Sequence, residues 1–335
     1  MNPISNFKAA VAGTGSYLPD KILTNYDLEN SINTSDEWIF TRTGIKERRI
    51  AAENESASTM AVGAAKKALK SANVSPDQVD MIIVCTSSPD VLFPSTACFV
   101  QKELEAFNSA AYDISAVCSG FVFGLSIAEQ YLKAGRYEHI LVIGSEVNSR
   151  IVDWSDRSTC ILFGDGAGAV LLEPASEGEE GIIDFILRSD GSGGKFLHLP
   201  GGGSLNPTSQ ETVEKKMHYV HQDGKQVFKY AVRKMYEVCR ELIDRNGLSP
   251  EDIDVFIAHK ANARIISAVA ERLGIPSAVE LRALERTSVD NVASMLSGGG
   301  SAFMLFFFGS ILIYLELHTQ VGPVSYTHLT LPTKA

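Results

Sequence analysis

The chain has 335 residues, of which 45% are hydrophobic and 21% charged, so it can bury a large core, and its composition excludes disordered and fibrous proteins. Thirty basic against forty acidic residues give a net charge of −10, which argues against nucleic-acid binding because phosphate contacts need a basic face. The five cysteines contain no C-x-x-C pair, so we expect neither a disulfide framework nor a metal site. This cysteine usage favours a cytoplasmic location.

The predicted elements alternate between short β-branched runs and helical patterns. The amino-terminal residues lack a basic flank followed by a long apolar run, so we expect no secretory signal. Strand-like runs cover 81–87, 139–146, 167–173 and 254–260, a helix-like run covers 119–135, and loops rich in Gly, Pro and Ser cover 174–181 and 188–207. This alternation predicts an α/β fold with helices covering the sheets.

An internal repeat connects two distant parts of the chain. Residues 68–86 and 242–260 share a helix end, a Ser-Pro-acid turn and a buried strand, at an offset of 174 residues (242 − 68 = 174). That period is too long for a solenoid, so it predicts a duplicated fold of two similar halves packed together. The repeat places Cys85 and His259 at the ends of equivalent strands, where α/β proteins build their sites.

Cys118 lies between a strand-like run and a helix-like run, in "DISAVCSGFVFG" (113–124). At a helix N-terminus, the unpaired N–H groups and the helix dipole favour a thiolate and can hold an oxyanion. The alternative is a packing residue, because free cysteines are commonly buried. His259, at a predicted strand end, is the candidate partner, and its alternative is a structural histidine.

Several motifs in order carry a family resemblance from about residue 8 to 276. They are "GTGSYLP" (13–19), "DEWIFTRTGIKERRI" (36–50), "FPSTAC" (93–98), "DISAVCSGF" (113–121), "DWSDRSTCILFGDGAGAV" (153–170), "GKQVFKYAV" (224–232) and "ANARI" (261–265). Together they resemble β-ketoacyl-acyl-carrier-protein synthase III of the thiolase superfamily. The resemblance implies two duplicated α/β halves in a layered α-β-α-β-α arrangement, residues 1–174 with the nucleophile and 175–322 with the catalytic His.

The resemblance implies a decarboxylating Claisen condensation that initiates fatty-acid synthesis. Cys118 would accept an acyl group, typically acetyl, from coenzyme A, and malonyl-acyl carrier protein would then supply the enolate. His259 and a later Asn would hydrogen-bond the malonyl thioester oxygen, which is electrostatic catalysis by preorganised donors. Coenzyme A enters as a thioester substrate, and no cofactor or metal is implied.

The resemblance also assigns binding roles. Trp38, Arg42, Thr43, Arg157, Phe228, Ala261 and Asn262 match coenzyme A positions. Phe93 matches the residue that closes the acyl pocket of the partner subunit, which implies a homodimer. For the acidic carrier protein, Lys229 and Arg264 are the expected contacts, within a set that also holds Lys215, Lys216 and Arg233.

The chain departs from the family pattern at three places. Lys260 replaces a Gln beside His259, where a cation would lower the pKa of the imidazole. Gln222 stands where many members have Met. Residues 277–322 lack the family's closing motifs, so Asn291, 32 residues after His259 (291 − 259 = 32), is the candidate third catalytic group in an unexpected context.

The last residues bear on what the chain can do. "PVSYTHLTLPTKA" (323–335) resembles a translated sequencing adapter, so we expect a non-native tail. The apolar run 302–315 is shorter than the roughly 20 residues that a membrane helix needs, so no membrane span is expected. Two alternatives to the synthase remain open: a truncated or chimeric inactive fragment, and a thiolase-fold acyltransferase with another acceptor.

Overall fold

A five-stranded mixed sheet forms the centre of the first half of the molecule. In this computed structural model, which describes residues 8–176, 181–253, 255–259, 262–275 and 303–305, the strand order is β1-β7-β6-β4-β5. Strand β4 is parallel to β5 and β6, whereas β7 is antiparallel to β6 and β1. The strands are β1 (Ala9–Tyr17), β4 (Met81–Cys85), β5 (Ala110–Ile114), β6 (Ile140–Val147) and β7 (Asp165–Pro174).

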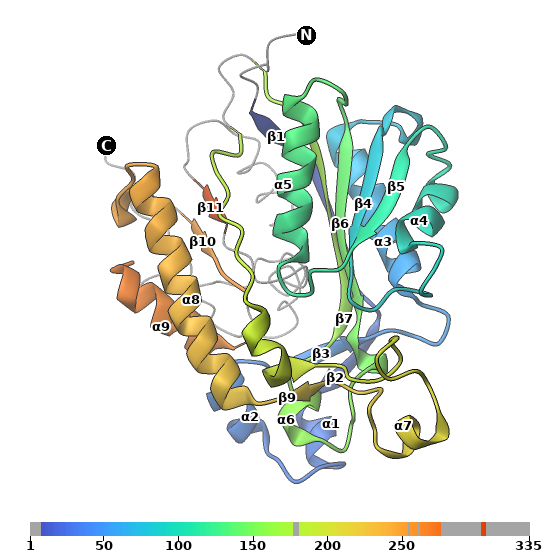
Figure 1. The fold of residues 1–335 in the computed structure, drawn as a ribbon, viewed down its shortest axis with the longest axis vertical. Coiled ribbons are helices and arrows are strands. Elements are labelled where there is room, and N and C mark those ends of the chain that lie inside the picture. The colour runs from blue at the N-terminus through green and yellow to red at the C-terminus, as the bar shows by residue number, and fades with distance from the viewer. Residues whose placement is uncertain (1–7, 177–180, 254, 260–261, 276–302, 306–335) are drawn as a thin grey trace.

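Helices cover both faces of this sheet. Every residue of β4 and β6 is buried, as expected for strands whose two faces are both covered. Helices α3 (Ala57–Ala72) and α4 (Thr96–Leu104) pack on one face, and α5 (Gly120–Lys133) packs on the other (Figure 1).

The second half adds a further sheet and helix layer beyond α5. Strand β10 (Val255–Ile257) pairs in parallel with β11 (Phe303–Leu305), and α8 (Gly224–Arg245) and α9 (Ala263–Leu273) share an apolar core with Phe256. Ile257 packs against the apolar cluster around α5. Helix α5 therefore lies between the two sheets, and the predicted α-β-α-β-α layering is confirmed (Figure 1).

The internal repeat is present in atomic detail. In the first copy, Ser75 N–H donates to Gln78 Oε1 at 3.0 Å. In the second copy, Ser249 N–H donates to Asp252 Oδ2 at 2.8 Å. Each of these 3-10 turns leads into a strand. The same local capping chemistry thus starts β4 and β10. The boundary between the halves at residue 174 stays a prediction.

Short elements form a base below the two sheets. Antiparallel β2 (Lys21–Thr24) and β3 (Glu47–Ile50) flank α1 (Asn25–Glu29) and α2 (Asp36–Thr43), which share a core with α6 (Arg157–Cys160). The predicted loop 188–207 contains the 3-10 turn Gly191–Phe196 and β8 (Leu197–His198), which pairs with β9 (His221–Gln222), and α7 (Gln210–Glu214) precedes β9. No helix in the described part of the chain combines the length and apolarity needed to span a membrane.

A close approach at Gly124 sets the position of α5, and we expect Gly124→Ala to destabilise the fold. A Cβ there would lie 2.7 Å from Cys85 Sγ and 2.9 Å from Val142 Cγ1, both on the sheet below. Overpacking costs about 1–3 kcal/mol, against a helix-propensity gain of about 1 kcal/mol for Ala over Gly. Urea unfolding should therefore show a net loss of up to roughly 2 kcal/mol. The control is Gly203→Ala, where the added Cβ meets nothing within 4 Å, and equal stabilities of the two variants would contradict this packing account.

Candidate active site

One cavity brings together predicted site residues from both halves of the chain. It has a volume of about 490 Å³, and Cys118, Phe228, His259 and Asn262 all line it. Much of the remaining lining is apolar: Leu162, Phe163, Leu197, Val227 and Met235. A largely apolar pocket with a few converging polar groups is the usual form of a small-molecule site.

Cys118 occupies a tight turn between β5 and α5. Val117, just before it, has φ +45°, a left-handed conformation that is unusual for a β-branched residue. The turn is closed by Ser119 N–H donating to the Ala116 carbonyl and Gly120 N–H donating to the Val117 carbonyl, each at 3.0 Å. Backbone strain of this kind tends to occur at functional sites, and here it holds the cysteine two residues before α5. The predicted position at a helix N-terminus is confirmed.

The thiol of Cys118 is not poised as a thiolate in the free chain. Burial, and after it the charge of Glu146, raise its pKa to about 12, although its own backbone N–H lowers the pKa in part. Sequence reasoning anticipated the favourable helix terminus but could not weigh it against the burial of the sulfur. A nucleophilic reaction therefore needs a base to accept the thiol proton.

His259 supplies a neutral imidazole to the same cavity. Burial lowers its pKa to about 4, so the ring is uncharged at neutral pH. Its Nδ1 atom is enclosed and has no hydrogen-bond partner among the described residues. The lowered pKa was expected from Lys260, but its cause here is burial, and Lys260 lies outside the described residues. A neutral imidazole can accept a proton or donate a hydrogen bond.

Asn262 and Phe228 come from the two helices of the second half. Asn262 Oδ1 caps α9 by accepting from Arg264 N–H at 2.9 Å. The Phe228 ring, near the start of α8, has the Arg264 guanidinium 5.8 Å from its centroid. The capping bond and the apolar face of α9 fix both side chains in the cavity wall. Two further predicted positions, Ala261 and Asn291, lie outside the described residues.

Trp38 carries two arginines outside this cavity. The guanidinium carbons of Arg42 and Arg157 lie 4.3 and 4.4 Å from its ring centroid, so the predicted Trp–Arg stack exists without a ligand. A purine between Trp38 and either guanidinium needs two van der Waals contacts, roughly 7 Å in all, so one arginine must withdraw for a base to stack. Neither arginine is buried, and Arg157 Nη1 donates to the Asn33 carbonyl at 2.8 Å.

Thr43 is placed differently from its predicted neighbours. It is buried at the end of α2, where its hydroxyl donates to the Ile39 carbonyl at 2.8 Å and accepts from Ile45 N–H at 3.0 Å. Both bonds serve the helix terminus. The following residue, Gly44, has φ +74° and packs against Ala263, which joins α2 to the start of α9.

Phe93 lies on an exposed apolar loop. Its side chain is 84% exposed, and it follows Leu92, which is 85% exposed. The loop starts at Ser87 and Ser88, whose hydroxyls donate to the buried carboxylate of Glu146 at 2.9 and 2.6 Å. An anchored loop with an exposed apolar tip is a suitable contact for a second protein surface.

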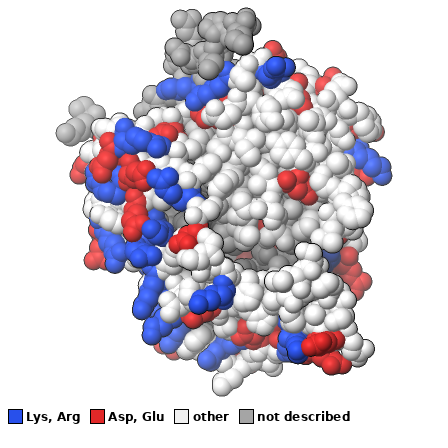
Figure 2. Space-filling model, viewed as in Figure 1, with Lys and Arg blue, Asp and Glu red and all other residues white. Residues whose placement is uncertain are grey.

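The predicted carrier-protein cations divide into two groups. Lys215, Lys216 and Arg233 form ion pairs with Glu211, Asp153 and Glu237, respectively. Among the described residues Lys229 and Arg264 form no ion pair, and both are exposed. Figure 2 shows Lys and Arg interleaved with acidic residues along the edge formed by α8.

The glycine-rich loop supplies a wall of the cavity that sequence reasoning missed. Asp190, Gly193, Gly194 and Phe196 line it, and the Asp190 carboxylate hydrogen-bonds Tyr230 of α8. The sequence treated 188–207 only as a break between halves, although its glycines were a possible signal for close approach to a ligand. Within the described residues, no group of three or more His, Cys, Asp or Glu side chains is placed to hold a metal ion.

Comparison with known proteins finds relatives that carry the name of one type of synthase. The model of a family described as 3-oxoacyl-[acyl-carrier-protein (ACP)] synthase III matches residues 112–191, and that of its C-terminal part matches residues 243–297. The β-ketoacyl-[acyl-carrier-protein] synthase III of Caldanaerobacter subterraneus subsp. tengcongensis is 55% identical over 265 residues, which cover 79% of this chain and 80% of that protein. The corresponding protein of Koribacter versatilis is 51% identical over 270 residues, covering 80% and 81%.

Solved structures show the same relationship. The 3-oxoacyl-[acyl-carrier-protein] synthase III of Aquifex aeolicus superposes with a TM-score of 0.73 at 48% identity, covering 81% of this chain and 82% of that one. The priming β-ketosynthase of the R1128 polyketide biosynthetic pathway superposes with a TM-score of 0.75 at 32% identity, covering 92% and 86%.

The burial of His259 predicts a specific pH dependence of stability. The imidazole pKa is about 4 in the folded chain and 6.5 for an unperturbed histidine, so the unfolded chain binds more protons between these pH values. Stability from this group is complete above pH 6.5 and is lost as the pH falls, by roughly 2–3 kcal/mol at pH 4.5. His259→Asn should remove that part of the loss in urea unfolding at pH 7 and pH 4.5. Parallel pH profiles for the two proteins would refute this assignment.

Proposed function

The chain belongs to the β-ketoacyl-acyl-carrier-protein synthase III family, and from this we propose that it condenses an acyl-coenzyme A primer, acetyl in the simplest case, with malonyl-acyl carrier protein. The product is a 3-oxoacyl-acyl carrier protein, and the reaction initiates fatty-acid synthesis. The observation that carries the proposal is the meeting of Cys118 and His259, one from each half, in a single cavity.

The first half-reaction is acyl transfer to Cys118. The thiol proton passes to the neutral imidazole of His259 while the sulfur attacks the thioester carbonyl. Coenzyme A leaves as its thiolate and recovers the proton. The raised pKa of Cys118 and the lowered pKa of His259 both keep the pair uncharged before the substrate arrives. Charge separation is then confined to the transfer step.

The second half-reaction is carbon–carbon bond formation. Malonyl-acyl carrier protein loses CO₂, the resulting enolate carbon attacks the acyl carbonyl, and the Cys118 sulfur leaves. An N–H of His259 stabilises the negative charge on the thioester oxygen, because a fixed donor in a low-dielectric cavity needs no reorganisation. Asn291 stays the proposed third group.

Binding roles follow the same assignment. Trp38, Arg42 and Arg157 hold the nucleotide of coenzyme A, with Thr43 beside them, and Phe228, Ala261 and Asn262 border the thioester arm. Phe93 closes the acyl pocket of a second subunit in a homodimer, and its exposed loop supports this. Lys229 and Arg264 contact the carrier protein, since neither is engaged by an acidic side chain of the described residues. A cytoplasmic enzyme without a resident cofactor is proposed.

The relatives bear on the alternatives raised by the sequence. Roughly half of the aligned residues are identical to proteins named as synthases III, which favours a condensing enzyme over an inactive fragment or a different acceptor. An acyltransferase with another acceptor would keep the same first half-reaction, so only the second half-reaction separates it from the synthase.

Incubation with acetyl-coenzyme A should therefore add the mass of one acetyl group to the intact protein. Peptide mapping should then locate that group on Cys118. The adduct should be absent in Cys118→Ala and present in Cys98→Ala, whose cysteine is also partly exposed. Adding malonyl-acyl carrier protein should then release the acetyl group as 3-oxobutanoyl-acyl carrier protein. An adduct on another cysteine, or none in a folded sample, would rule out Cys118 as the acyl acceptor.

The nucleotide site can be tested through its tryptophan. The chain has two tryptophans, and Trp154 is engaged separately, donating from Nε1 to the Ser149 carbonyl at 3.1 Å. In Trp154→Phe, coenzyme A should change the emission of Trp38 saturably, because an adenine displaces an arginine from the ring. In Trp38→Phe the change should vanish. The same change with pantetheine, which lacks adenine, would exclude Trp38 as the nucleotide platform.

A further inference from the structure

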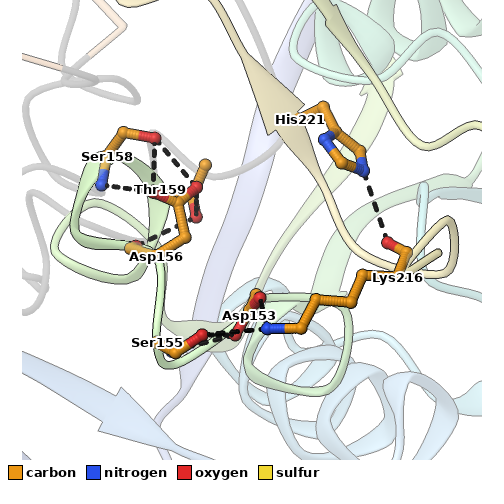
Figure 3. Close-up of polar contacts among 7 residues, drawn as sticks. All are labelled: Asp153, Ser155, Asp156, Ser158, Thr159, Lys216 and His221. Atoms are coloured by element: carbon orange, nitrogen blue, oxygen red, sulfur yellow. Dashed lines mark hydrogen bonds and ion pairs between the residues drawn. The ribbon is translucent and has the colours of Figure 1, made fainter. Parts of the chain in front are cut away.

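Residues 151–157, which end at Arg157, contact residues 216–222, which end at Gln222 in the cavity lining. Lys216 Nζ lies 2.7 Å from Asp153 Oδ2 and 3.0 Å from Ser155 Oγ, as Figure 3 shows. Nearby, Val220 N–H donates to the Ile151 carbonyl at 2.8 Å. These contacts join residues 151–155 to residues 216–220 across more than sixty positions of sequence.

On the first side, Asp153 stands four residues before Arg157. Ser155 donates to its carboxylate from both N–H and hydroxyl, at 2.9 and 2.6 Å. The next carboxylate, Asp156, caps α6 by accepting from Ser158 N–H at 2.8 Å (Figure 3). Because α6 is a single turn that begins at Arg157, these two aspartates hold the backbone from which the Arg157 side chain extends, and its guanidinium donates to the Asn33 carbonyl at 2.8 Å.

On the second side, Lys216 precedes the cavity wall by a few residues. It has φ +54°, so the chain turns sharply there, and its carbonyl lies 3.3 Å from His221 Nε2. His221 and Gln222 form β9, and Gln222 lines the cavity that contains Cys118. The backbone of Lys216 thus contacts the strand that borders the cavity, whereas its side chain reaches Asp153, so replacing the side chain acts on the segment before Arg157.

We propose that the Lys216–Asp153 ion pair is a positioning device that sets Arg157 for the nucleotide of the acyl-coenzyme A substrate. The inference rests on the proposed function. In this proposal the charge of Lys216 serves to hold Asp153 and is not a docking cation for the carrier protein. The hydrogen bond from Lys216 lowers the pKa of Asp153 to about 2, so the pair is charged throughout the neutral range.

The position of the pair limits the size of its effect. The Lys216 side chain is 56% exposed and that of Asp153 18%, so water and salt screen the attraction. Exposed pairs of this kind change an equilibrium by about two- to fivefold. The effect should fall on ligands that contain the nucleotide and spare the chemistry at Cys118, because neither residue lines the cavity.

The test compares Lys216→Met and Asp153→Asn with two controls. Lys216→Arg keeps the cation, and Lys215→Met removes a neighbouring cation whose partner, Glu211, is on its own helix. Calorimetric Kd values for coenzyme A and for adenosine 3′,5′-bisphosphate should rise about two- to fivefold in the first two variants at low salt and stay unchanged in the controls. Because the two residues act as one unit, the double variant should be no weaker than either single one.

A second measurement separates positioning from general damage. KM for Cys118 acetylation should rise with acetyl-coenzyme A but not with acetyl-pantetheine, and kcat should stay constant. Equal Kd values for wild type and Lys216→Met, an equal rise in KM with both donors, or no binding of coenzyme A to wild type would overturn the inference. Binding of coenzyme A without acetylation of Cys118 would instead refute the proposed function and leave the calorimetric result standing.

Discussion

The site depends on the confinement of α5 between two sheets. Its Gly124 allows the helix to approach Cys85 and Val142 of the first sheet, while Ile257 of the second sheet packs against the same apolar cluster. A helix held on both sides cannot shift without disturbing two cores, since protein interiors are close-packed. Cys118 lies on the turn that leads into this helix and is held by it, and His259 follows β10, whose Ile257 packs against the apolar cluster around α5.

The same burial that fixes these side chains determines their protonation. The pKa of Cys118 is raised and that of His259 is lowered, and in each case burial is the largest cause. Both shifts favour the neutral form, because the cost of a charge rises as water is excluded. An uncharged pair suits a cavity whose lining is largely apolar.

Sequence patterns captured the features that depend on local chemistry. The Ser-Pro-acid turns at Ser75 and Ser249 located two equivalent strands, and the helix-like run 119–135 located α5. Features that depend on packing were not accessible. The burial of the Cys118 sulfur, the internal hydrogen bonds of Thr43 and the pairing of Lys216 with Asp153 all arise from segments distant in sequence. Ala261 and Asn291 lie outside the described residues, and their proposed roles rest on the family resemblance.

The duplicated fold also shows how one structural position can serve two purposes. Position 85 in the first half corresponds to position 259 in the second (259 − 85 = 174). Cys85 is fully buried against Gly124, with its pKa raised by burial and by Glu146, so it is a core residue. His259, at the equivalent strand end, lines the cavity instead. Since α5 covers the end of β4 but leaves the end of β10 open to the cavity, the first copy supports the helix that follows Cys118, and the second copy places a side chain in the cavity that Cys118 lines.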